Sequence, residues 1–73
     1  MAKRVIETVG TDGVTPPLYF LGYRDHGQGW ECLWTPSRTR ARFFDADEAE
    51  IEIRLIAPFV EPRRILSAQP VLA

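Results

Sequence analysis

The fold is decided by two neighbouring apolar runs, Leu18-Tyr19-Phe20-Leu21-Gly22-Tyr23 and Gly29-Trp30-Glu31-Cys32-Leu33-Trp34-Thr35. Both are rich in the aromatic and β-branched residues that strands favour. The turn between them, residues 24–29, holds two glycines near an aspartate, which is the composition that a hairpin reversal requires. We therefore predict a β-hairpin over residues 18–35.

Side chains alternate between the two faces of a strand, so the hairpin has two chemically different sides. In the first strand the alternation places Leu18 and Phe20 on one face and three further side chains on the other, Tyr19, Leu21 and Tyr23. In the second strand it places Trp30, Cys32 and Trp34 on a common face.

Further strands are predicted at both ends of the chain. Lys3–Val9 is rich in β-branched residues and is broken by a glycine-containing turn, residues 10–13. Arg63–Ala68 has the composition of a last strand, and Pro70 would confine any extension of it to a sheet edge.

The segment from Asp45 to Ala57 carries two conflicting patterns. A helix is favoured by its start, where Asp45 and Glu48 have the spacing of a capping box. The helix would have one apolar stripe, made of Ala46, Ala49, Ile53 and Ile56. A strand is favoured by the strict alternation over residues 50–55, and a helix would leave Ile51 and Leu55 on its far side.

A proline limits the length of this segment. Pro58 is predicted to end it, with residues 59–62 as a turn or loop. We predict an α+β fold: a small antiparallel sheet (hairpin 18–35 plus N- and C-terminal strands) with one helix, about residues 46–57, packed on a face. The alternative is an all-β small barrel or sheet with residues 49–57 as a strand.

The composition indicates one small folded domain, residues 1–73. A chain of 73 residues buries only roughly 60% of the surface that its unfolded form exposes, so a partner or a second copy is a reasonable expectation. The formal net charge of −1 gives no overall attraction to nucleic acid. A single cysteine, together with the lack of a signal-peptide or membrane-spanning pattern, predicts a cytosolic location and no membrane partner.

Several short motifs in the middle of the chain occur in a recognisable order. They are the aromatic strand 19–23, Gly29-Trp30, Trp34-Thr35, Ala41-Arg42-Phe43-Phe44, Asp45-Ala46-Asp47 and Glu48-Ala49. In this order the chain resembles a group of very short phage and mobile-element proteins, over roughly half its length. The resemblance implies a hairpin, a helix on one sheet face and a closing strand. It extends, at the level of the fold, to small phage anti-CRISPR inhibitors, which have an Ala-Arg-x-Phe-Asp-like run before a helix.

Few residues offer catalytic or metal chemistry. Cys32, His26 and Asp25 contain the groups of a nucleophile, a base and an orienting acid, but a lone cysteine on a packed strand face is usually inert. One cysteine and one histidine are too few for a zinc site. The acidic run 45–48 could ligate Mg²⁺ or Ca²⁺, yet a capped helix start already explains its carboxylates. We predict no enzyme activity, no metal and no cofactor.

Aromatic and arginine side chains predict a contact surface instead, because Trp, Tyr and Arg are enriched at the energetic centres of protein interfaces. The predicted protein-binding residues are Tyr19, Tyr23, Trp30 and Trp34 as anchors, with Arg38, Arg40 and Arg42 for orientation. We predict a non-catalytic protein-binding module, a phage or mobile-element product that inhibits or modulates a host defence or nucleic-acid-processing complex. Its partner would be a host or phage protein.

Two alternatives remain open from the sequence. An extended backbone would place Arg38, Arg40 and Arg42 on one side, where with Arg63 and Arg64 they would contact phosphates in a small nucleic-acid-binding protein. The near-neutral net charge does not favour that alternative. The other alternative is a phage structural or accessory protein that acts as a homodimer or larger homo-oligomer.

Overall fold

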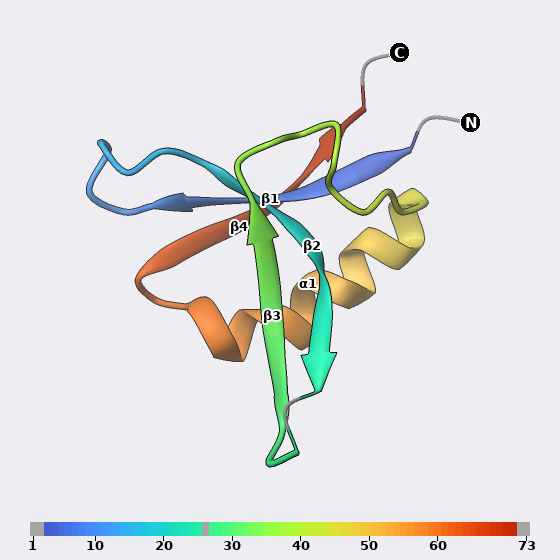
Figure 1. The fold of residues 1–73 in the computed structure, drawn as a ribbon. Coiled ribbons are helices and arrows are strands. Elements are labelled where there is room, and N and C mark those ends of the chain that lie inside the picture. Colours follow the sequence, from blue (N-terminus) through green and yellow to red (C-terminus); the bar gives the residue numbers. More distant parts are fainter. Residues whose placement is uncertain (1–2, 26, 72–73) are drawn as a thin grey trace.

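The structure, a computed structural model, describes residues 3–25 and 27–71. Its elements follow the order β1 (Arg4–Gly10), β2 (Leu18–Asp25), β3 (Trp30–Thr35), α1 (Ala46–Val60) and β4 (Arg64–Pro70). The strands form one antiparallel sheet in the order β3-β2-β1-β4, and α1 packs on one face of it (Figure 1). The predicted α+β fold is therefore confirmed, and the alternative with a strand over residues 49–57 is wrong.

The start of α1 follows the predicted capping chemistry. Glu48 reaches back and accepts a hydrogen bond from the backbone N–H of Asp45, at 3.2 Å. The Asp45 carboxylate also accepts a 2.8 Å hydrogen bond from Lys3, which ties the helix start to the beginning of β1. Ala49 and Ile56 are fully buried against the sheet, with Ile53 packed beside them. Ala46, also predicted to face the core, is exposed at the first position of the helix.

The end of α1 differs from the prediction. Pro58 was expected to terminate the helix, but the helix continues through it to Val60. Pro58 has no N–H to donate to the Arg54 carbonyl oxygen, but the N–H of Glu61 still reaches the carbonyl oxygen of Ala57, at 2.9 Å. Val60 packs against the core cluster, so tertiary contacts favour the extra turn. This turn also brings Phe59 onto the helix surface.

The sheet is continuous on one side of β1 and splits on the other. β1 pairs with β4 at every residue from Arg4 to Gly10, whereas it pairs with β2 only through Glu7 and Thr8. The connector, residues 36–45, enters the resulting gap. Its Arg42 N–H donates to the Phe20 carbonyl oxygen at 3.0 Å, and Phe44 pairs with Arg4 through two backbone hydrogen bonds of 2.7 and 2.8 Å. The β2–β3 hairpin therefore diverges from β1 and β4 (Figure 1).

An irregularity in β2 changes which side chains share a face. Phe20 pairs with Trp34, but Gly22 pairs with the next residue of β3, Leu33, so Leu21 is an extra residue. Such a bulge reverses the alternation beyond it. Tyr23 therefore lies on the same face as Phe20, with ring centroids 5.1 Å apart. The predicted placement of Tyr23 on the opposite face is wrong.

The face of the sheet away from α1 has its own small core. Val5, Tyr19 and Ala41 are buried together there, with Val71 packed beside them. Ala41 belongs to the connector and Val71 follows β4, so segments outside the sheet cover this face in part. Of the four predicted aromatic anchors, only Tyr19 belongs to this cluster.

Phe44 fills the gap at the split, where its ring stacks on Phe20 with centroids 6.1 Å apart. It is 5% exposed, while its neighbour Phe43 is 45% exposed. Phe44→Ala should lower the free energy of unfolding by about 3–5 kcal/mol, because a large cavity is left in the core. Phe43→Ala, the matched control, should cost about 1 kcal/mol or less. Urea unfolding followed by circular dichroism measures both, and equal losses would contradict the role given to Phe44.

Candidate functional site

The structure does not bring the seven predicted binding residues onto one surface. Tyr23, Trp30 and Trp34 lie on the face of the hairpin that looks toward α1. Tyr19 lies on the opposite face and is only 8% exposed. Tyr23 and Trp34 are partly buried, because they pack against the core between the sheet and α1. Trp30 alone is mostly exposed, at 62%.

The three connector arginines do not form the predicted row. Residues 38–40 make a turn, in which the N–H of Ala41 bonds to the carbonyl oxygen of Arg38, so the backbone is not extended there. The Arg38 guanidinium lies over the Tyr19 ring, 5.9 Å from its centroid, and donates a 2.6 Å hydrogen bond to the Pro70 carbonyl oxygen. Arg42 instead lies over Phe44, at 5.5 Å, and Arg40 is exposed. The three side chains therefore do not act together: Arg38 contacts Tyr19 and Pro70, Arg42 contacts Phe44, and Arg40 is exposed to solvent.

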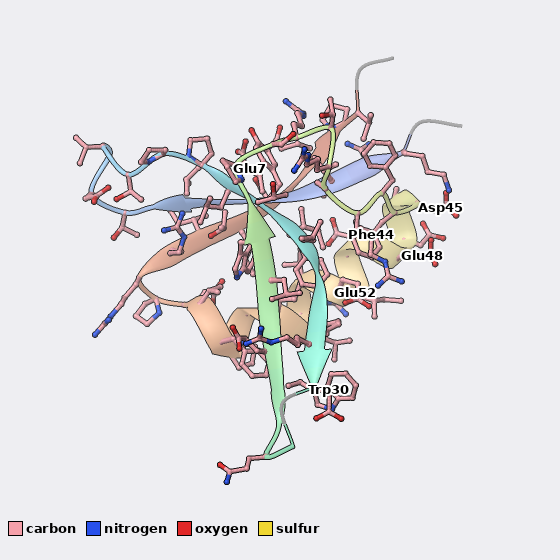
Figure 2. The ribbon with its side chains drawn as sticks, in the orientation of Figure 1. Glu7, Trp30, Phe44, Asp45, Glu48 and Glu52 are labelled. Carbon is pink, nitrogen blue, oxygen red and sulfur yellow. The ribbon has the colours of Figure 1, made fainter. Side chains whose placement is uncertain are left out.

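A groove lies between the turn end of the hairpin and the second half of α1. Tyr23 and Trp30 line it from the hairpin, and Glu52, Leu55 and Phe59 line it from the helix. We call this set the hairpin–helix groove. Its volume is about 370 Å³. Figure 2 shows Trp30 at the turn end of the hairpin and Glu52 on α1.

The walls of the groove are apolar and open to solvent. Trp30, Leu55 and Phe59 are 62%, 56% and 61% exposed. Ile51, Leu55 and Phe59 are spaced by four residues, so they form a second apolar stripe along the helix, away from the buried one. Large exposed apolar groups that gather in one place are characteristic of contact surfaces. Within residues 3–25 and 27–71 no element covers the stripe, because α1 packs mainly against β4 and β1 and not against the hairpin.

Glu52 is the charged side chain of the groove, and Tyr23 holds it in place. The Tyr23 hydroxyl donates a 2.7 Å hydrogen bond to Glu52 Oε2 across the groove. Burial raises the pKa of Tyr23 well above its ordinary value, and the bond to the Glu52 carboxylate raises it further. Tyr23 therefore stays a neutral donor, and the hydrogen bond links the hairpin to the helix.

A second hollow adjoins the groove and shares Glu52 with it. We call it the connector hollow, and its volume is about 290 Å³. The connector and the first half of α1 line it with Arg42, Phe43, Phe44, Glu48, Ile51 and Glu52. Figure 2 shows that Glu48 and Glu52 lie along α1, near Phe44. An apolar groove and a charged hollow thus meet at one carboxylate.

Of the candidate catalytic groups, Asp25 lies at the end of β2 and Cys32 on the paired strand β3. Burial, and after it the charge of Glu52, raise the pKa of the Cys32 thiol, so the reactive thiolate is disfavoured. His26 lies outside the described residues. The acidic run at the helix start is engaged by Lys3 and by the Asp45 N–H.

Over residues 3–25 and 27–71, His, Cys, Asp and Glu side chains form no group of three or more that would hold a metal ion. No helix within those ranges is long and apolar enough to cross a membrane.

Sequence reasoning missed the helix half of the groove. Glu52, Leu55 and Phe59 were not among the predicted binding residues. The signal was present, since Ile51 and Leu55 were expected on the far side of any helix, and an uncovered apolar position there requires an explanation. Phe59 lies beyond Pro58, the predicted end of the helix, so the sequence placed it in a loop.

Comparison with known proteins adds no relative: the chain matches no family model, no curated protein and no solved structure. The resemblance to small phage proteins and anti-CRISPR inhibitors therefore stays a prediction from the sequence.

The pH dependence of the unfolding free energy tests whether the Tyr23 hydroxyl is bound to Glu52 in the folded protein. Unfolded tyrosine deprotonates near its ordinary pKa of 10.0, whereas folded Tyr23 stays protonated to a higher pH. Its contribution to stability should therefore be complete below pH 10 and decline as the pH rises above it. Tyr23→Phe should show a smaller loss of unfolding free energy between about pH 9 and about pH 11 than the wild-type protein. Urea titrations at both pH values measure this, and identical losses would contradict the shifted pKa.

Proposed function

We propose that this protein is a non-catalytic binding module that holds a segment of a partner protein in the hairpin–helix groove. One observation carries the proposal. Trp30, Leu55 and Phe59 come from two separate elements, are each more than half exposed, and converge on the same hollow. Exposing these groups to water is unfavourable by roughly 25 cal/mol per Å² of apolar surface, which a bound partner would recover.

The shape of the groove favours a protein partner over a small molecule. Small-molecule sites bury about 70–90% of their ligand, which requires enclosing walls. Here three of the five lining side chains, Trp30, Leu55 and Phe59, are themselves mostly exposed. An open groove of this kind suits a side chain that projects from a partner whose own surface covers the rim.

The biological setting of the proposal comes from the sequence resemblance alone. It would make the partner a host protein, or a component of a host defence or nucleic-acid-processing complex that a phage product modulates. The raised pKa of Cys32 is in keeping with a non-catalytic role.

Two matched variants test the proposed function. Leu55 lies in the groove and is 56% exposed, while Ile65 lies on the opposite face of the sheet, on β4, and is 54% exposed. Proteins captured from a host lysate would be identified, purified and titrated by calorimetry. Leu55→Ala should raise the Kd of a true partner by about tenfold or more, the effect of truncating a central contact. Ile65→Ala should leave it unchanged.

The purification step guards against non-specific capture. If no purified protein distinguishes Leu55→Ala from Ile65→Ala, the groove is not the binding site. Circular dichroism of each variant would establish that the fold is intact. We expect it to be, because substitutions at exposed positions have small effects on stability.

A further inference from the structure

The groove carries one charged group whose hydrogen-bonding capacity is only partly used. A carboxylate accepts several hydrogen bonds through its two oxygens. Tyr23 donates to Oε2 of Glu52, and among residues 3–25 and 27–71 no donor reaches Oε1. Neither of the ion pairs in that part of the chain, Lys3–Asp45 and Arg24–Glu31, involves Glu52.

The helix that carries Glu52 is acidic, and Glu48, one turn before Glu52, lines the connector hollow with it. Between Ala46 and Val60 the helix carries four carboxylates, Asp47, Glu48, Glu50 and Glu52, against one guanidinium, Arg54, which gives a formal charge of −3. Arg42 is the positive group of the connector hollow, and it lies over the Phe44 ring. A cation from outside would therefore find an attractive potential where the apolar groove ends.

We infer that the groove selects a basic amphipathic segment, in which an aliphatic or aromatic side chain stands close to a lysine or arginine. The apolar side chain fills the space between Trp30 and Leu55, and the cation binds the free oxygen of Glu52. Such charge-assisted hydrogen bonds are stronger than neutral ones and fix the orientation of the partner. This inference rests on the proposed function, because it names the chemistry of what the groove holds.

Charge argues against a second copy of this chain as the occupant. Self-association through the groove would bring two helices of charge −3 together, and it would place acidic surfaces opposite each other. Like charges across an interface are unfavourable. A basic partner has the complementary sign.

The test uses a random library of 12-residue peptides, selected against the immobilised wild-type protein. Enriched peptides would be synthesised and titrated against wild type, Leu55→Ala, Glu52→Gln, Tyr23→Phe and Ile65→Ala. Glutamine keeps the shape of Glu52 and an acceptor for Tyr23 but removes the charge. Tyr23→Phe removes the hydroxyl and keeps the charge.

The inference predicts a specific pattern. Enriched peptides should carry lysine or arginine within four residues of a large apolar residue. Their Kd should rise about tenfold or more in Leu55→Ala and about threefold to tenfold in Glu52→Gln, with a weaker salt dependence in the latter. Tyr23→Phe should retain the preference for basic peptides, and Ile65→Ala should match wild type.

Other results would overturn the inference in distinguishable ways. Peptides that depend on Leu55 but lack basic residues, and that bind Glu52→Gln as well as wild type, would refute the basic partner and leave the proposed function standing. Enriched peptides that do not depend on Leu55 would refute both. A wild-type dimer in sedimentation equilibrium that becomes monomeric in Leu55→Ala would assign the groove to self-association instead.

Discussion

The stacking of Phe44 on Phe20 is the contact on which the rest of the structure depends. The two rings meet where β2 separates from β1. There the strands no longer pair with each other, and the connector instead forms backbone hydrogen bonds with both. Phe44 immediately precedes the helix start, so the same contact sets where α1 begins. Arg4 on one side and Asp45 on the other complete a junction at which strand, connector and helix are joined.

The groove follows from this split. The helix lies closest to β4 and β1, while the hairpin diverges and meets the helix only through long side chains. Phe20, Tyr23 and Trp34 fill the space near the split, with edge-to-face ring contacts of 5.1 and 5.6 Å from Phe20. Farther along the hairpin the separation is no longer filled, and Trp30 faces Leu55 and Phe59 across solvent. The 2.7 Å hydrogen bond from Tyr23 to Glu52 joins the hairpin to the helix directly.

Local patterns predicted the elements, and non-local contacts determined their faces and limits. The hairpin, both outer strands and the capped start of α1 could be predicted because turn glycines, β-branched runs and the Asp45–Glu48 spacing act over a few residues. The bulge at Leu21 could not, since it depends on pairing with β3. The continuation of α1 past Pro58 depends on the packing of Val60. Both features affect the candidate site, because the bulge moves Tyr23 to the groove face and the longer helix places Phe59 on the groove wall.

The most direct test of this account is acrylamide quenching of tryptophan fluorescence in two single-tryptophan variants. Trp34→Phe leaves Trp30 as the reporter in the groove, and Trp30→Phe leaves Trp34, which packs against Phe20 in the core. The account predicts red-shifted emission and a several-fold larger quenching constant for Trp30 than for Trp34. Equal quenching of the two indoles, or an equally shielded Trp30 in the isolated monomer, would contradict an open groove between the hairpin and the helix.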